Sequence, residues 1–161
     1  MSTGGPRRVR HPCGFAVDLP RGAELLGEHE WGLEASLPAA APAARFLAAI
    51  DARPRVQVRS EVPVDRRTKE GWVAVSLVAQ AEALVGARLL DEESTTIAGR
   101  PARRTLTQHL AEARLSVTLE QWWVLTSERE TVLSVSLASL DVAAQAATVS
   151  ALSASLDLEA R

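Results

Sequence analysis

The alternation of apolar and polar residues along the chain predicts a series of β-strands, because successive side chains in a strand point to opposite faces. The clearest strand is 55–62, where Val56 and Val58 share one phase while Arg55 and Arg59 share the other. The other expected strands are 15–19, 31–37, 87–90, 95–98, 102–109, 113–126 and 131–139.

Apolar residues that recur at steps of three and four predict a helix over 70–85. They are Val73, Leu77, Ala81 and Leu84. A second helix is expected over 141–156, where Asp141 can cap the N-terminus. Strands in succession with one helix between them and one after them predict an α+β fold. We expect a mostly antiparallel sheet with both helices packed on one face.

The length and composition are those of a single folded domain. The chain has 161 residues, of which 47% are hydrophobic and 24% are charged. Residues 1–12 are rich in Gly, Pro and Arg, which predicts a flexible N-terminal tail ahead of a single α+β domain over 13–161. The net charge of −2 gives no general attraction to nucleic acid.

The N-terminal region and the single cysteine bear on the compartment. Cys13 is the only cysteine, which excludes an intrachain disulfide and favours the cytosol. Arg7, Arg8 and Arg10 resemble the charged start of an export signal, but the apolar run that such a signal needs does not follow them. Apolar stretches of membrane-spanning length do not occur. We therefore expect a cytoplasmic protein without membrane insertion.

Strand parity within 113–125 predicts which side chains face the core. The phase that contains Val117 and Trp123 is expected to pack beneath the helices. Adjacent tryptophans in a strand cannot both point inward without a bulge, so Trp122 is expected on the outer face. The same rule gives an outer face rich in arginine and hydroxyl side chains. It comprises Arg55, Gln57, Arg59, Arg103, Thr105, Thr107, His109, Arg114, Ser116, Thr118, Glu120, Trp122, Val124, Ser134 and Ser136.

This outer face is a candidate protein-binding surface, because tryptophan and arginine are enriched at the energetic centres of interfaces. Trp122 is the expected anchor. The candidate partner-binding residues are Trp122, Arg114, Arg103, Arg59, Thr118 and Thr105. The alternative is that Trp122 is covered by a loop or by the Pro/Ala-rich connector 38–44.

The sequence contains no local motif that is typical of a catalytic or metal site. His11, His29 and His109 have no second ligand at a metal-binding spacing, and Cys13 has no neighbour in the sequence that would activate its thiol. Phosphate-loop, dinucleotide-binding and hydrolase motifs do not occur. We expect no cofactor, no metal and no enzyme activity; an acid–base pair without a local motif stays open.

Three short stretches carry a family resemblance. Residues 15–20 form an apolar strand that ends at a proline, residues 97–103 place a Gly-x-Pro turn between two strands, and Gln121-Trp122-Trp123 lies in a long strand ahead of the last helix. This order of elements, from about residue 14 to 157, resembles the PsbP-like fold family. That family includes DcrB-like proteins, LpqN-type lipoproteins and Eag-type effector chaperones.

The resemblance implies a cytoplasmic, actinobacterial-looking member, since the exported branches carry a signal or lipid anchor. Proteins of that branch are adaptors or chaperones that cradle a client segment, often as dimers and beside a secretion system. Two departures stand out. The Gly-Trp that often follows the first proline is replaced by Arg21-Gly22-Ala23, and the expected outer face is more polar than a chaperone for transmembrane segments needs.

The preferred function is therefore a non-catalytic adaptor or chaperone-like protein that binds a protein or peptide client on the outer face of its sheet. One alternative is a small-molecule-binding protein or an undetected enzyme. Its pocket would lie between sheet and helices and use polar groups such as Arg104 and Gln108. The other alternative is a structural subunit of a homodimer.

Overall fold

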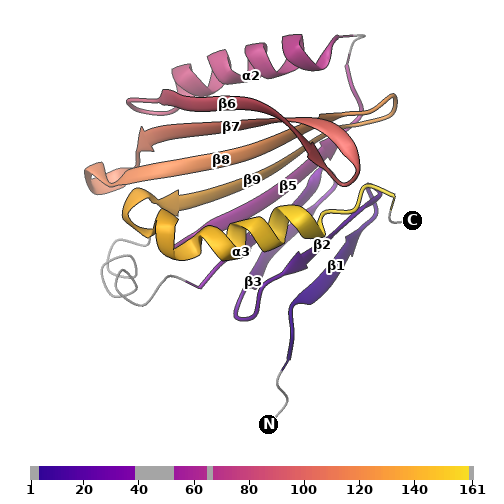
Figure 1. The fold of residues 1–161 in the computed structure, drawn as a ribbon, viewed down its shortest axis with the longest axis horizontal. Coiled ribbons are helices and arrows are strands. Elements are labelled where there is room, and N and C mark those ends of the chain that lie inside the picture. Colours follow the sequence, from indigo (N-terminus) through magenta and orange to yellow (C-terminus); the bar gives the residue numbers. More distant parts are fainter. Residues whose placement is uncertain (1–3, 39–52, 65–66, 160–161) are drawn as a thin grey trace.

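The computed structural model describes residues 4–38, 53–64 and 67–159. Within them the strands are β1 (Arg7–His11), β2 (Phe15–Leu19), β3 (Glu24–His29), β4 (Gly32–Ser36), β5 (Arg55–Glu61), β6 (Arg88–Ile97), β7 (Arg100–Leu110), β8 (Ser116–Leu125) and β9 (Glu130–Ala138). The α-helices are α2 (Lys69–Ala83) and α3 (Val142–Ser155). Strands β3-β4-β5-β9-β8-β7-β6 form a seven-stranded antiparallel sheet, and β1 pairs with β2 beside it (Figure 1). The predicted α+β class is confirmed.

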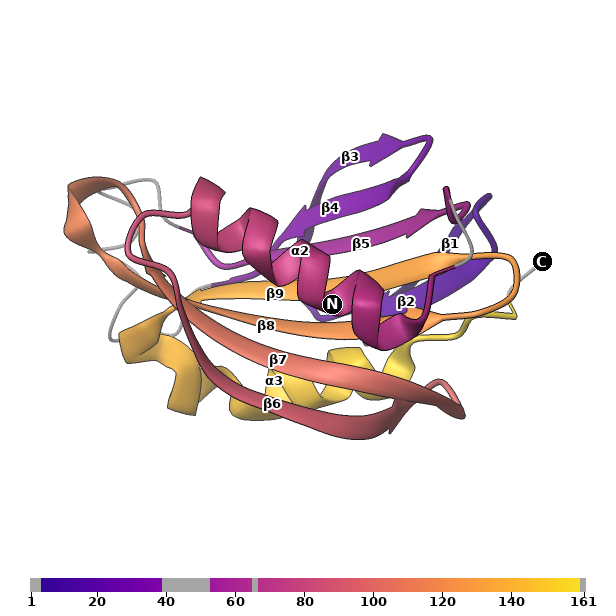
Figure 2. The same cartoon turned by 90° about the horizontal axis from the view of Figure 1, so that it is seen from above.

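The helices α2 and α3 lie on opposite faces of the sheet, which corrects the expectation that both pack on one face. Gln80 of α2 donates a hydrogen bond to Gln121 of β8 at 2.8 Å, whereas Val149 of α3 shares a core cluster with Trp122. Because neighbouring residues of a strand face opposite sides, these contacts place the helices on different faces. Figure 2 shows α2 on the near side of the strands and α3 on the far side.

The main hydrophobic core lies between the sheet, β2 and α3. Its largest fully buried side chains include Phe15, Leu19, Leu33, Leu133 and Leu152. A smaller cluster beneath α2 consists of Trp72, Val73 and Trp123. The face under α2 is therefore held by a few large side chains, and the face under α3 by most of the apolar residues.

Strand β1 replaces part of the flexible tail expected over 1–12; residues 1–3 lie outside the described residues. Its register pairs Arg7 with Leu19 and His11 with Phe15. The buried ring of His11 stacks on Phe15, with ring centroids 4.9 Å apart. Long-range pairing with β2 orders a segment whose local sequence reads as a loose tail.

The strands at 15–19 and 55–61 match their predicted positions closely, and the two predicted helices are confirmed. Strand β3 is not predicted, because its exposed edge carries a bulge that disturbs the apolar alternation. The expected short strands 87–90 and 95–98 are the two ends of β6. The connector 38–44 lies, apart from Pro38, outside the described residues. Within the described part of the chain, neither helix has the length and apolarity to cross a membrane.

Candidate functional site

Trp122 and Trp123 point to opposite faces of the sheet, as strand parity predicts, but both are buried. Their exposed fractions are 6% and 3%. Trp123 meets the ring of Trp72 edge-on, with centroids 5.4 Å apart, and its indole Nε1–H donates to Thr105 Oγ1 at 2.9 Å. Trp122 belongs to the main core beside α3. The expected exposure of Trp122 is wrong, because each face of β8 carries a helix.

The six predicted partner-binding residues do not share one surface. The strand registers place Arg59, Arg103 and Thr105 on the same face as Trp123, here called the α2 face. Thr118 and Trp122 lie on the opposite face, here called the α3 face. Arg114 precedes β8 in a 3-10 turn with a φ of 59°. Strand parity predicts the polar face correctly for β5, β7 and β9. In β8 it is wrong, because the phase that contains Thr118 and Trp122 lies on the α3 face.

A groove of about 300 Å³ runs between α2 and the sheet and is here called the α2 groove. Its apolar wall is formed by Trp72, Trp123 and Val132. Its polar wall is a chain of hydrogen-bonded side chains: Gln80 donates to Gln121 at 2.8 Å, and Gln121 donates to Ser134 Oγ at 3.1 Å. The groove thus combines aromatic surface with amide and hydroxyl groups.

Beside the α2 groove stands a partly exposed tryptophan that the sequence reasoning did not single out. The Trp31 ring stacks on His29 with centroids 4.5 Å apart, and the Arg59 guanidinium carbon lies 4.7 Å from its ring centre. We call His29, Trp31 and Arg59 the Trp31 cluster. Arg59 also lines the α2 groove and is 45% exposed by its side chain, so groove and cluster form one continuous surface.

Glycine at position 32 fixes this arrangement. Gly32 follows Trp31 directly, has a φ of 153° and pairs with Arg59 in the β4–β5 register. A Cβ atom at this position would lie 1.8 Å from the Val58 carbonyl oxygen. The close approach of the two strands is what brings the Arg59 side chain over Trp31.

A second groove, of about 370 Å³, lies between α3 and the sheet and is here called the α3 groove. Its apolar lining is formed by Trp122, Val135, Leu137, Val142, Ala146 and Val149, and Thr118, Ser150 and Ser153 add hydroxyl groups. At one end Arg104 binds Glu120 at 2.6 Å and Glu93 at 3.1 Å. Burial lowers the pKa of Arg104, but hydrogen bonding and charge from Glu120 and Glu93 outweigh it and raise the pKa overall.

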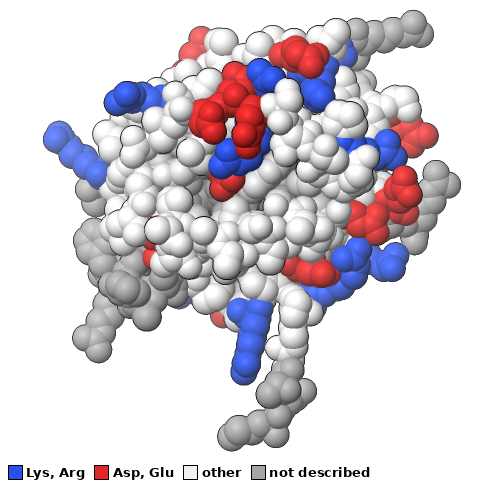
Figure 3. Space-filling view, viewed as in Figure 1, with Lys and Arg blue, Asp and Glu red and all other residues white. Residues whose placement is uncertain are grey.

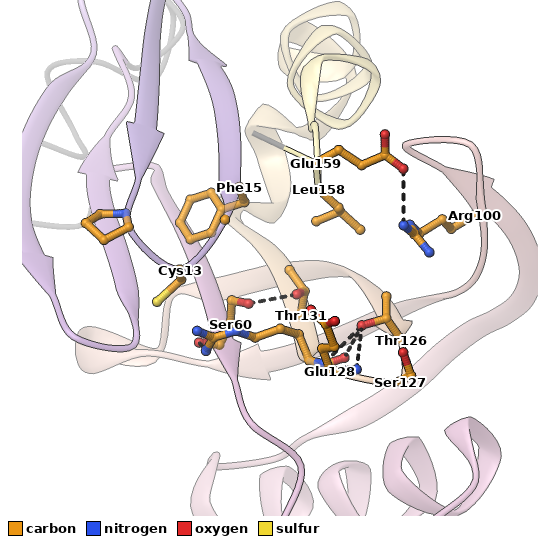
Figure 4. Close-up of a pocket in the computed structure, with 13 residues that line it drawn as sticks. Cys13, Phe15, Ser60, Arg100, Thr126, Ser127, Glu128, Thr131, Leu158 and Glu159 are labelled. Carbon is orange, nitrogen blue, oxygen red and sulfur yellow. Dashed lines mark hydrogen bonds and ion pairs between the residues drawn. The ribbon is translucent and has the colours of Figure 1, made fainter. Parts of the chain in front are cut away.

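A polar hollow of about 700 Å³ lies at the end of the sheet, between the β1–β2 turn, the β8–β9 turn and the C-terminal segment (Figure 4). Several of its polar groups are paired: Arg100 binds Glu159 at 3.3 Å, and Ser60 and Thr131 share a hydrogen bond at 3.0 Å. The Cys13 thiol at its rim donates to the Glu30 carbonyl at 2.9 Å. These pairings make the hollow a poor site for nucleophilic chemistry.

The histidine nearest to Cys13 does not act on its thiol. His11 Nδ1 accepts a hydrogen bond from the Cys13 backbone N–H at 3.1 Å, and His11 Nε2 faces the His29 carbonyl at 2.9 Å. The ring therefore carries its proton on Nε2 and is occupied by backbone groups. Within the described ranges, no three His, Cys, Asp or Glu side chains gather as a metal site requires.

Comparison with known proteins reveals similarity of fold. No protein-family model and no curated protein matches this sequence. Among solved structures, the PsbP of Synechocystis sp. PCC 6803 (CyanoP) superposes with a TM-score of 0.64 at 12% identity, over 98% of this chain and 96% of that one. The Ran-binding protein Mog1p of Saccharomyces cerevisiae gives 0.61 at 11% identity, over 97% and 96%.

LpqN of Mycobacterium tuberculosis, described as involved in cell envelope biogenesis, gives a TM-score of 0.60 at 10% identity, over 96% of this chain and 86% of that one. Structural similarity at sequence identities this low shows a shared fold and does not establish a shared function. The chain has the α+β fold, built on an antiparallel sheet, that PsbP and Mog1 share.

Proposed function

We propose that this chain is a non-catalytic adaptor or chaperone-like protein that binds a protein segment on its α2 face. The observation that carries the proposal is the Trp31 cluster at the mouth of the α2 groove. A partly exposed tryptophan with an arginine over its ring has the composition of an interface hot spot. We therefore retain the part of the expected partner face that β5 and β7 carry, with Trp31 in place of Trp122 as anchor.

The surroundings of the cluster suit a peptide backbone. Gln57 Nε2 donates to Glu34 Oε1 at 2.8 Å, which leaves the amide oxygen and the second amide N–H of Gln57 for a client. Gln121 and Ser134 continue this polar strip toward α2. Such groups can hydrogen-bond an extended client while an apolar client side chain packs on Trp31 or in the α2 groove.

The solved structures of the same fold add support of a general kind. The yeast neighbour is named as a Ran-binding protein, so this fold can serve protein recognition. A protein or peptide client is the partner class that we propose for the present chain, with cytoplasmic residence as part of the same proposal.

A site-specific photocrosslinker tests the surface. Benzoylphenylalanine at Glu61, on the α2 groove, is expected to capture a client in the native cell, and the same group at Ser150, on the α3 groove, is not. The captured client is then titrated against purified variants. Trp31→Ala or Arg59→Ala is expected to weaken binding about 30-fold, the cost of losing a hot spot.

Arg88→Ala removes an exposed arginine from the far edge strand and serves as the matched control, with unchanged affinity. All three variants should keep melting temperatures within a few degrees of the parent, because these side chains are at least partly exposed. Capture from Ser150 alone, or a client that binds Trp31→Ala as tightly as the parent, would exclude the α2 face.

A further inference from the structure

The α3 groove has a different character from the α2 face and lies on the other side of the sheet. Its apolar surface is contributed by Trp122, Val135, Leu137 and Val149. Helix α3 has no charged residue among its 14 positions, so one whole wall of the groove is neutral. A body of apolar atoms placed here would be removed from water on several sides.

Arg104 and Glu120 line one end of this groove, and two further acidic residues, Asp91 and Glu93, lie just outside the lining in contact with Arg104. Arg104 contacts three carboxylates: Glu120 at 2.6 Å, Glu93 at 3.1 Å and Asp91 at 3.4 Å. Three negative charges against one positive charge leave a net charge of −2 at this end. Figure 3 shows acidic groups gathered on the upper part of this face above a broad uncharged area, with further charged groups toward its edges. Arg104 donates from Nε to Glu120 and from Nη1 to Asp91 and Glu93, and the net negative charge of this group disfavours an anion.

Two of the three carboxylates have room for a further partner. The side chains of Asp91 and Glu93 are 55% and 52% exposed, whereas Glu120 is 19% exposed and committed to Arg104. Arg88 of β6 is a second cation on this face of the sheet. It pairs with Gln108 in the β6–β7 register, away from Arg104 of β7. A ligand cation at Asp91 and Glu93 would neutralise the excess charge.

We propose that the α3 groove is a binding site for a small organic cation with an apolar body, such as an alkyl or aryl amine. The body would lie on Trp122 and Val149, and the ammonium group would face Asp91 and Glu93. A volume of about 370 Å³ is the size of a small-molecule site, and a few polar groups at one end of an apolar pocket are the usual arrangement for orienting a ligand.

The experiment uses three probes with the same eight-carbon tail: n-octylammonium, n-octanol and octanoate, each below the concentration at which it forms micelles. The indole N–H resonance of Trp122 in the full chain, assigned by loss in Trp122→Phe, reports occupancy of the groove. The expected result is a saturable shift with octylammonium at an affinity at least about tenfold tighter than with octanoate, because the two probes differ in the sign of their charge.

Two variants separate the parts of the site. Asp91→Asn with Glu93→Gln should weaken octylammonium about fivefold and leave octanol unchanged, because only the charged head group loses a partner. Ala146→Trp fills the groove and should abolish all three shifts. Should that variant fold poorly, Ser150→Leu on the exposed rim provides the second test.

Several outcomes overturn the proposal. They are octanoate binding as tightly as octylammonium, a shift of Trp31 in place of Trp122, and a Trp122 shift caused only by a Leu-Lys-Leu peptide, which would identify a protein segment as the occupant. Because the Trp31 cluster lies on the opposite face, crosslinking at Glu61 and probe binding at Trp122 succeed or fail independently.

Discussion

Arg67 donates two hydrogen bonds to the carboxylate of Glu130, from Nε to Oε1 at 2.8 Å and from Nη2 to Oε2 at 2.9 Å. Glu130 opens β9 and its side chain is only 8% exposed, while Arg67 lies just ahead of α2. Arg67→Ala would leave a buried carboxylate without its cation. We expect a loss of about 3 kcal/mol in the free energy of unfolding, measured by urea denaturation.

The exposed ion pair between Arg53 and Glu24 provides the control. Its atoms are 3.9 Å apart and its side chains are 58% and 71% exposed. Because solvent screens such a pair, Arg53→Ala should change stability by less than about 0.5 kcal/mol. If the two arginine variants lose equal stability, the bidentate contact does not anchor the start of α2.

Trp122→Ala tests the correction to the predicted site. The side chain packs in the main core with Val149 and Leu133, so its removal should cost about 3–5 kcal/mol and lower the melting temperature markedly. Had Trp122 been the exposed anchor, the same change would leave the melting temperature nearly unchanged. Differential scanning calorimetry distinguishes the two readings directly.

Trp72→Ala should act locally. Helix α2 buries only Trp72 and Val73, and its side-chain bond to the sheet is Gln80 to Gln121. Loss of the Trp72–Trp123 contact should therefore free α2 before the sheet unfolds. Hydrogen exchange should show lost protection across 69–83 and retained protection in β8. Equal loss in β8 would mean that α2 and the sheet open as one unit.

The sequence predicts which side chains of a strand face the core wherever the strand has one apolar and one polar phase. Strand β5 is such a case: Val56 and Val58 are buried, and Arg59 is exposed. Strand β8 is not, because residues 121–124 are all buried and each phase carries a tryptophan. Parity there separates Trp122 from Trp123 but cannot say which of them meets the larger core. For this reason the sequence pattern wrongly predicts both helices on one face.

The Trp31 cluster needed information that local patterns do not contain. His29 reaches Trp31 through the tight β3–β4 turn, and Arg59 reaches it only through the register that pairs Gly32 with Arg59. Strand pairing between segments so far apart in the chain is a tertiary property. The composition of the polar face was therefore predictable, and its aromatic anchor was not.

Gly32→Ala should break this site through the backbone. The added Cβ would lie 1.8 Å from the Val58 carbonyl oxygen, and a φ of 153° is unfavourable for alanine. Strands β4 and β5 would have to separate, at a cost of about 3 kcal/mol or more in unfolding free energy. Trp31 fluorescence should shift to the red as the ring loses Arg59. Gly5→Ala, which meets nothing within 4 Å, is the control and should change stability by less than about 0.5 kcal/mol.

The outer strands of the sheet carry acidic residues, which bears on self-association. Strand β6 contains Asp91, Glu92 and Glu93, and β3 contains Glu24 and Glu28. Antiparallel pairing of β6 centred on Glu92 would set Glu92 against Glu92 and Asp91 against Glu93 of the second copy, and like charges directly opposite each other are destabilising. We therefore expect a monomer at micromolar concentration in sedimentation velocity experiments.

Reversal of the charge at Glu93 should weaken the repulsion that opposes pairing of two β6 edges. Glu93→Lys would place a lysine opposite Asp91 of the second copy twice in each antiparallel pair, and each opposite-charge pair contributes about 0.2–1 kcal/mol. The two pairs together should raise the association constant by about two- to thirtyfold, with the effect reduced by salt. Glu82→Lys on the exposed side of α2 makes the same change in net charge away from the edge and should leave the sedimentation coefficient unchanged. A parent chain that already dimerises, with no difference between the two lysine variants, would show that an interface other than the β6 edge joins the copies.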